Sequence, residues 1–171
     1  AEDIERAGSA VPYLHPDRAL SLEWKNRFNE STKINVGLVW AGSPTHLRDK
    51  YRSLRLSKLA PLINLPNVRF YSLQKGPATE ELIGLPQGFN VVDLSAELED
   101  FTDTAAAISQ LDLVICVDTA VAHLAGALGR PVWVMAPFSP EWRYGIAGDA
   151  MPWYPSVRVF RQPVYSDWDA V

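Results

Sequence analysis

The sequence contains a single cysteine, Cys116, among its 171 residues. One cysteine excludes an intramolecular disulfide and a zinc site built from cysteines. Long apolar runs are also missing, because the longest clean ones span about five residues, as at 113–117, whereas a membrane helix needs roughly 20. No charged start followed by an apolar core opens the chain, so we see no secretion signal and expect a cytoplasmic protein without a membrane span.

An excess of positive charge is absent as well. The chain has 16 Lys and Arg against 20 Asp and Glu, a net charge of −4, so we expect no nucleic-acid partner. The three histidines lack the spacing of metal ligands, and we expect neither a metal nor a cofactor. The glycine fingerprint of dinucleotide binding, the phosphate loop and the Gly-x-Ser-x-Gly hydrolase elbow are all missing. Cys116 lies in an apolar stretch, which favours a buried small hydrophobe over a nucleophile.

The residues that are present indicate an α/β protein. Hydrophobic residues make up 47% of the chain, enough to bury a core and to exclude disorder as the main state. Apolar stretches, several without alternation, predict strands at 34–40, 68–73, 89–94, 113–117, 131–135 and 157–160. Helical patterns lie between them, at 57–65, 79–82, 97–110 and 119–128. This alternation predicts a Rossmann-like open, mostly parallel sheet of about six strands with helices on both faces.

Three parts are expected along the chain. Residues 1–33 form a linker with a short docking helix, in which Leu20, Trp24 and Phe28 recur at a spacing of four. Residues 34–165 form the Rossmann-like domain. Residues 166–171 are interpreted as the start of a truncated C-terminal helix.

Candidate site residues follow the strands, because ligands of open parallel sheets bind outside the carboxyl ends. Asp118 and Thr119 follow the fourth strand and open a helix whose small first-turn residues leave its amides uncovered, a site suited to phosphate. His123 lies in the same turn and can point toward the same mouth. The alternative is that Asp118 and Thr119 only cap the helix and that His123 bonds a neighbouring loop.

The loop after the first strand, 41–53, carries three basic residues, among them Lys50 and Arg52. These side chains could clamp a pyrophosphate, and Gly42 and Ser43 allow close approach of the backbone. The alternative is a solvated loop without a ligand.

Further candidates follow the second strand, open the helix before the fourth strand, and follow the fifth strand. Gln74 could bond a base or a phosphate, and Glu80 or Glu81 could bind ribose hydroxyls, although acids are also common in exposed first turns. Phe101 could pack on a base, but core packing is its expected role. The loop 136–144, rich in aromatic residues and proline, can wall a pocket or pack against a second domain.

The stretch 111–132 contains Asp-Thr-Ala-Val-Ala-His-Leu-Ala-Gly-Ala-Leu followed by Gly-Arg-Pro. It resembles the donor-binding signature of the bacterial heptosyltransferase (ADP-heptose) family. The flanks are similar to the C-terminal glycosyltransferase-like domain of bacterial tetratricopeptide-repeat proteins, at 11–14, 37–44, 52–53, 72–76, 142–143 and 152–155. The arrangement is more distantly similar to the C-terminal catalytic half of O-linked N-acetylglucosamine transferases.

This resemblance implies the donor-binding C-terminal half of a metal-independent glycosyltransferase with the two-domain GT-B architecture. The residues implied to meet the nucleotide-sugar donor are Ser43, Lys50, Arg52, Gln74, Lys75, Asp118, Thr119, Ala120 and His123. The N-terminal half, with the acceptor site and the acidic catalytic base, and tetratricopeptide repeats of the same polypeptide would lie outside this chain. We therefore expect the isolated chain to bind donor without turnover.

One position departs from the family signature. Ala120 stands where the family has glycine, which would weaken donor binding if the position requires a positive φ or very close backbone approach. Two alternatives stay open. One is a non-catalytic scaffold or protein-interaction module that retains the fold, and the other is a different nucleotide-dependent enzyme, such as an epimerase, acting on the same substrate class.

Overall fold

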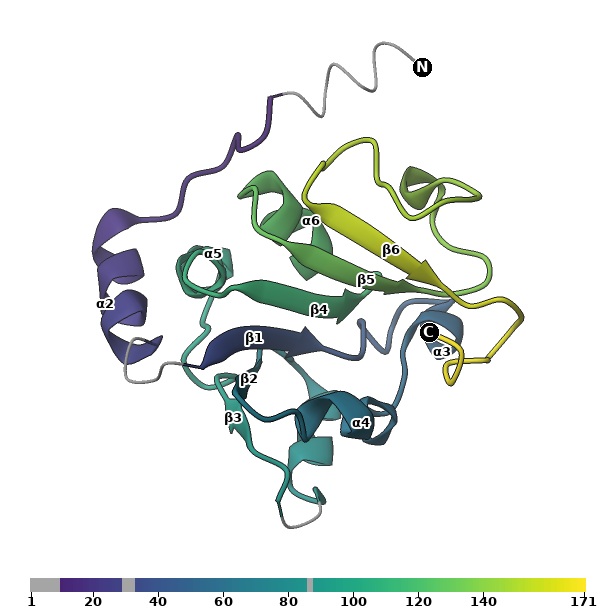
Figure 1. Ribbon diagram of the computed structural model, residues 1–171, viewed down its shortest axis with the longest axis horizontal. Helices are drawn as coiled ribbons and strands as arrows, with labels where there is room; N and C mark the ends of the chain where they lie inside the picture. Colours follow the sequence, from purple (N-terminus) through teal and green to yellow (C-terminus); the bar gives the residue numbers. More distant parts are fainter. Residues whose placement is uncertain (1–9, 29–32, 86–87) are drawn as a thin grey trace.

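The structure is a computed structural model that describes residues 10–28, 33–85 and 88–171. Its centre is a six-stranded sheet in the order β3-β2-β1-β4-β5-β6 (Figure 1). The strands are β1 (Ile34–Val39), β2 (Val68–Ser72), β3 (Val91–Asp93), β4 (Leu113–Val117), β5 (Val132–Ala136) and β6 (Val157–Arg161). Every neighbouring pair is parallel. The predicted Rossmann-like α/β fold is confirmed, and each predicted strand is present.

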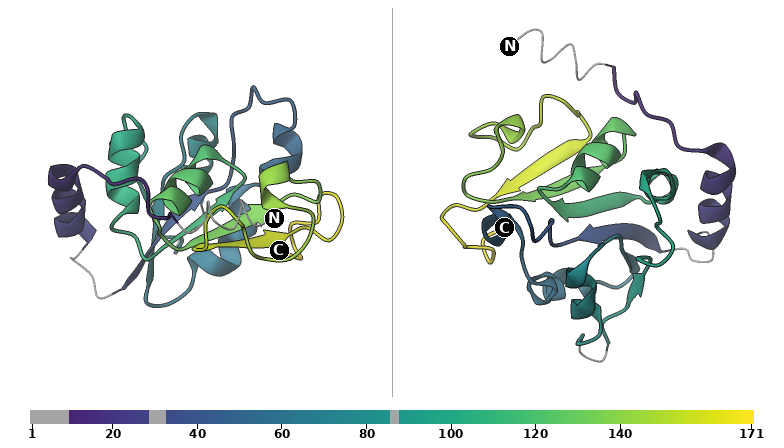
Figure 2. Two further views of the ribbon diagram at one scale, coloured as in Figure 1. Left: turned by 90° about the horizontal axis from the view of Figure 1, so that it is seen from above. Right: turned by 180° about the vertical axis from the view of Figure 1, so that it is seen from behind.

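Helices cover both faces of the sheet, as Figure 2 shows from above. On one face lie α2 (Arg18–Phe28), α5 (Phe101–Ile108) and α6 (Ala120–Ala127). On the other face lie the 3₁₀ turn η1 (Leu56–Leu59) and α4 (Ala60–Ile63). The remaining short elements are α3 (Asp49–Arg52), η2 (Pro77–Leu82) and η3 (Trp142–Tyr144).

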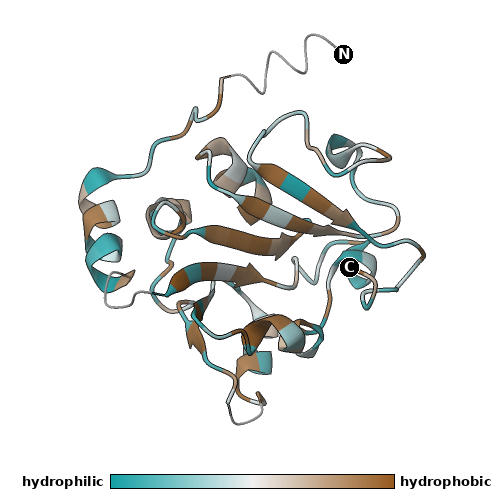
Figure 3. Cartoon of the chain, in the orientation of Figure 1, coloured by the Kyte–Doolittle hydropathy of each residue, from teal (hydrophilic) through white to brown (hydrophobic). Residues whose placement is uncertain are grey.

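Strand β4 shows why apolar runs without alternation become central strands. Val114 and Cys116 are buried against the face of α5 and α6, and Ile115 and Val117 against the opposite face. Figure 3 accordingly shows β4 as apolar along its length. Burial also raises the pKa of the Cys116 thiol, so Cys116 is an inert core residue, as predicted.

Helix α6 lies close to the sheet because its buried residues are small: Ala122, Ala125, Gly126 and Ala127. A Cβ on Gly126 would stand 2.5 Å from the Tyr154 ring, so only glycine allows this approach. The helix ends at Ala127, and Gly129 follows with φ 68°, which confirms the predicted stop.

Two helix predictions are corrected by the structure. The predicted helix 97–110 begins only at Phe101, because the Asp100 side chain caps it there. The predicted helix 57–65 is divided into η1 and α4.

Helix α2 and the last residues of the chain both pack on the domain. Trp24 and Phe28 of α2 are buried, and the Phe28 and Tyr71 ring centroids lie 4.5 Å apart. Residues 1–9 and 29–32 of the predicted linker lie outside the described residues. Residues 166–171 form turns and do not begin the expected helix, because Trp168 and Val171 pack against the core beneath the sheet. Across the described ranges, no helix combines the length and the apolar character that crossing a membrane demands.

The strand order reverses direction between β1 and β4. The chain proceeds outward from β1 through β2 to β3, and outward on the other side from β4 through β5 to β6. The loops that leave β1 and β4 therefore diverge, and an open crevice forms at the carboxyl ends of these strands.

Candidate functional site

A cleft in two parts occupies this crevice. The first cavity, about 360 Å³, lies under the loops that follow β1 and β5, and the second, about 450 Å³, lies between β1, β2, α5 and α6. Arg52, Thr119 and Ala120 line both cavities. These residues mark the junction of the cleft, where the start of α6 faces the loop after β1.

The start of α6 is not capped by a side chain of the described residues. Thr119 has the extended N-cap conformation, with φ −143° and ψ 168°, but its side chain makes no capping hydrogen bond. Its hydroxyl oxygen is buried without a hydrogen-bond partner of normal geometry in the described chain, although it lies near enough to Cys116 to influence that thiol. The Ala122 amide donates to the Thr119 backbone oxygen at 3.1 Å. Thr119 and Ala120, at the start of this eight-residue helix, line the junction, where the helix dipole favours an anion.

Arg52 faces the same junction in a fixed orientation. Its Nη1 donates a hydrogen bond to the backbone oxygen of Asp118 at 3.0 Å, and its Nε lies 3.4 Å from Asp49 Oδ1. A Cβ on Gly42 would lie 2.5 Å from the guanidinium, so glycine at this position leaves the space that Arg52 occupies. The arrangement presents a planar cation beside the open helix start, a pairing suited to phosphate.

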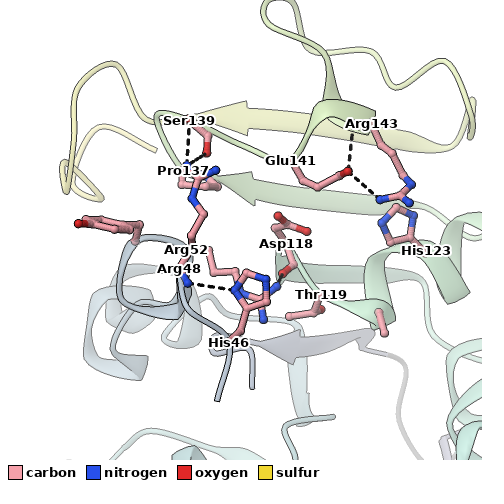
Figure 4. A pocket seen from close by; sticks show the side chains of 12 residues that line it. His46, Arg48, Arg52, Asp118, Thr119, His123, Pro137, Ser139, Glu141 and Arg143 are labelled. Atoms are coloured by element: carbon pink, nitrogen blue, oxygen red, sulfur yellow. Dashed lines mark hydrogen bonds and ion pairs between the residues drawn. The ribbon is translucent and has the colours of Figure 1, made fainter. Parts of the chain in front are cut away.

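Asp118 and His123 lie in the first cavity with perturbed pKa values (Figure 4). Burial raises the pKa of the Asp118 carboxyl, while Arg52, the nearby Tyr144 hydroxyl and His123 oppose this shift. No hydrogen bond of normal geometry joins Tyr144 to Asp118. Burial lowers the pKa of His123, against the opposing effect of Asp118, and so favours the neutral imidazole.

Charged side chains of two loops form the outer wall of the first cavity. Arg48 Nη2 donates to the backbone oxygen and to Oγ of Ser139, both at 3.0 Å, and so connects the loops after β1 and β5 (Figure 4). Glu141 and Arg143 pair at 2.8 Å and line the same cavity. The sequence indicates that the loop 136–144 could line a pocket, and 142–143 belong to the resemblance, but neither Glu141 nor Arg143 is among the predicted site residues. Their position after the carboxyl end of the fifth strand is the sequence signal that could have placed them in the site.

The second cavity is the more apolar one, and Phe101 lies at its edge. Core packing was the expected role of Phe101, and that expectation is wrong. Phe101 is 61% exposed because it is the first residue of α5, whose alanines at 105–107 take the buried face. An exposed ring in this position can stack on a planar ligand.

Gln74 and Lys75 line the second cavity but are occupied by the protein itself. Gln74 Oε1 accepts from the amides of Trp40 and Ala41 at 3.1 and 2.9 Å, and its Nε2 donates to two backbone oxygens. Lys75 Nζ donates to the backbone oxygens of Ser95 and Leu98. Both side chains position loops at the edge of the cleft, and Gln74 in particular has no hydrogen-bonding group left over for a base.

The other candidates fall in different places. Ser43 is exposed at the second cavity and its hydroxyl bonds that of Thr45 at 2.9 Å. Lys50 lines neither part of the cleft, because its Nζ lies over the Tyr51 ring and faces a separate hollow. Glu81 accepts from the Leu56 amide in that same region, so it does not meet a ribose in the cleft.

Ala120 adopts an ordinary conformation. It is the first residue of α6 and does not have a positive φ. The position therefore needs no glycine for conformational reasons, and the exposed methyl group only narrows the junction. No group of three or more His, Cys, Asp or Glu side chains among the described residues could hold a metal ion.

These features define a class: a Rossmann-like α/β domain with a charged cleft at the switch point of its sheet, where ligands of such sheets bind. Residues 58–160 match the model of glycosyltransferase family 9 (heptosyltransferase), and the chain belongs to this family. Its members use nucleotide sugars, as the resemblance of the 111–132 signature implies.

Solved structures of this family share the fold. A family 9 glycosyl transferase from Veillonella parvula superposes with a TM-score of 0.66 at 15% identity, covering 92% of this chain and 45% of that one. ADP-heptose LPS heptosyltransferase II of E. coli superposes with a TM-score of 0.55 at 16% identity, covering 91% of this chain and 46% of that one. The E. coli heptosyltransferase WaaC with ADP superposes with a TM-score of 0.51 at 19% identity, covering 88% of this chain and 45% of that one.

A curated relative is similar over most of this chain. Protein FlbA of Caulobacter vibrioides is 32% identical over 168 residues, which cover 92% of this chain and 27% of FlbA. The chain thus spans about a quarter of this relative and less than half of each solved structure.

Proposed function

We propose that this chain binds the nucleotide-sugar donor of a metal-independent glycosyltransferase of GT-B architecture. The observation that carries the proposal is the junction of the cleft, where the uncapped start of α6 meets Arg52. These two features lie side by side and both supply positive potential to the junction. A diphosphate placed there would be bound by backbone amides and by a fixed guanidinium.

The two parts of the cleft suggest how the donor lies. The apolar second cavity, with Phe101 at its edge, suits the nucleobase. The charged first cavity, with Asp118 and His123, suits the hydroxyl groups of the sugar. The diphosphate then lies between them at Thr119 and Ala120.

Glycosyl transfer requires the nucleoside diphosphate to leave with its negative charge. The helix dipole of α6 and Arg52 would stabilise that charge as it develops, without a metal ion. The acceptor site and the catalytic base would come from a further domain of a longer polypeptide. This chain covers only 45–46% of each solved family member, which supports a division into two domains. Tetratricopeptide repeats in that polypeptide, and a cytoplasmic location, stay predictions from the sequence.

Thermal unfolding with a panel of ligands tests the proposal. ADP, GDP, UDP, CDP and NAD are compared at millimolar concentration. A diphosphate present at 100 times its dissociation constant stabilises the folded chain by roughly 2.7 kcal/mol, a rise of about 5–10 °C in Tm for a chain of this size.

The variant Ala120→Leu fills the junction from an exposed helix position and should abolish the rise. Ser57→Leu, exposed on η1 away from the cleft, is the matched control and should keep it. The absence of a rise with every diphosphate would favour the alternative of a scaffold that retains the fold.

A further inference from the structure

An exposed tryptophan adjoins the charged cavity. Trp142 is 67% exposed and lies in η3 between Glu141 and Arg143, both of which line the first cavity. Single exposed apolar residues are common on protein surfaces, but Trp142 is flanked by two residues that line a cavity and has a ring neighbour in Trp153.

The indole is held in place by two neighbours. The Trp153 ring lies at 6.0 Å from the Trp142 ring in a T-shaped arrangement, with an interplanar angle of 85°. The Arg143 guanidinium carbon lies 4.8 Å from the Trp142 ring centroid. The ring plane is therefore fixed before a ligand arrives, which lowers the entropic cost of binding.

Glu141 and Arg143 add hydrogen-bonding groups with compensating charge. Glu141 Oε1 and Arg143 Nη1 lie 2.8 Å apart, with side chains 30% and 46% exposed. Glu141 Oε2 also accepts the Arg143 amide at 3.0 Å, which holds the carboxylate in the loop. The pair offers an acceptor and several donors side by side without net charge, unlike the cationic junction at Arg52. This set fits an uncharged ligand with neighbouring hydroxyl groups.

We propose that Glu141, Trp142 and Arg143 form a subsite for a pyranose ring. The carboxylate and guanidinium would bond adjacent hydroxyls, and the negative π face of Trp142 would contact the C–H bonds of one ring face. The sugar is either that of the donor or that of the acceptor, because both would reach the outer end of the same cleft. In placing a sugar beside the diphosphate junction, the inference rests on the proposed function.

The experiment follows the indole N–H signals of the ¹⁵N-labelled chain by NMR. The probes are the methyl pyranosides of mannose, galactose and N-acetylglucosamine, up to about 100 mM because single sugars bind in the millimolar range. The Trp142 signal is identified by its loss in Trp142→Leu. We expect at least one pyranoside to shift it saturably, and Glu141→Gln to weaken that binding at least tenfold. Trp133→Leu, on the opposite side of β5 beside Phe160, should leave binding unchanged.

The outcomes separate the subsite from the donor site and the two sources of sugar. If a nucleoside diphosphate stabilises the chain but no pyranoside moves the Trp142 signal, the subsite is refuted and the proposed function stands. If pyranosides move the Trp142 signal while no diphosphate binds, the sugar subsite stands and the proposed donor site at the junction is refuted. Competition between the pyranoside and the corresponding nucleotide sugar would assign the subsite to the donor sugar. Simultaneous binding would assign it to the acceptor.

Discussion

Helices α5 and α6 have the same length, eight residues, and both border the second cavity, yet they begin in opposite ways. At α5, Asp100 accepts from the amides of Thr102 and Asp103 at 2.6 and 3.1 Å, and Asp103 accepts in return from the Asp100 amide. At α6, Thr119 provides no such bond.

The difference separates a structural helix start from one suited to a ligand. The amides of α5 are satisfied by carboxylates of the protein, which also complement the helix dipole. The start of α6 faces a cleft, with Arg52 held beside it by the Asp118 backbone oxygen. An anion bound there would take the place that Asp100 has at α5.

Giving α6 the cap of α5 should have the largest effect. Thr119→Asp places a carboxylate where the diphosphate is proposed to bind. We expect about a 100-fold loss of nucleoside diphosphate affinity, about 2.7 kcal/mol, measured by calorimetry. The unliganded variant should melt slightly higher than wild type, because Asp caps helices well. Undiminished affinity would place the diphosphate elsewhere.

Removing the arginine beside the start of α6 should have the next largest effect. Arg52→Ala deletes a charged donor at the junction, and we expect affinity to fall about 30-fold, or about 2 kcal/mol. Lys50→Ala removes the same charge two residues away, outside the cleft, and should leave affinity nearly unchanged. Equal losses in both variants would show that only net charge matters.

Phe101, the first residue of α5, tests whether this helix contacts the base of the nucleotide. Phe101→Ala should weaken nucleoside diphosphate binding by about 1–2 kcal/mol through lost stacking on the base. The Tm of the free variant should match wild type, because the ring is largely exposed. Phe138→Ala, which removes another exposed ring outside this cavity, serves as the control. If inorganic pyrophosphate loses as much affinity as the nucleotide, the stacking role is wrong.

Removing the cap of α5 should affect stability and spare binding. Asp100→Ala leaves two amides of α5 without their acceptors, so we expect Tm to fall by a few degrees. The rise in Tm on adding a diphosphate should be as large as in wild type. A reduced rise would mean that the two helix starts are coupled.

The two aspartates should give opposite pH dependences, the smallest effect. Amide hydrogen bonds lower the Asp100 pKa, so its stabilisation is present above the ordinary value of 3.8 and is lost as pH falls through the lowered pKa. Burial raises the Asp118 pKa, so its contribution is present below 3.8 and is lost as pH rises through the raised pKa. Urea unfolding from about pH 3 to about pH 7 measures the free energy of unfolding at each pH. Asp118→Asn should reduce its pH dependence in the upper part of this range, and Asp100→Asn should reduce it in the lower part.

The sequence predicts the sheet well because its strands are apolar on both faces. The apolar run of β4 and the spacing of Trp24 and Phe28 in α2 predict burial, and these residues are indeed in the core. The start of α5 was misplaced by four residues, because Glu97 and Asp100 are equally plausible near a helix start until the capping bonds are known.

Side-chain direction was harder to predict than position. Loop position alone made Lys50 and Arg52 equivalent, but only Arg52 turns toward Asp118. Gln74 was expected to meet a ligand, yet it bonds the backbone at the end of β1. The pairing of Glu141 with Arg143 depends on a loop fold that no local pattern indicates.

The most direct measurement is a titration of the ¹⁵N-labelled chain with inorganic pyrophosphate, read at the backbone amides of both helix starts. We expect saturable shifts at Ala120 and Val121 of α6 and none at Thr102 and Asp103 of α5. Shifts of similar size at both helices, or none at α6 while pyrophosphate binds elsewhere, would contradict the claim that the open start of α6 is the diphosphate site.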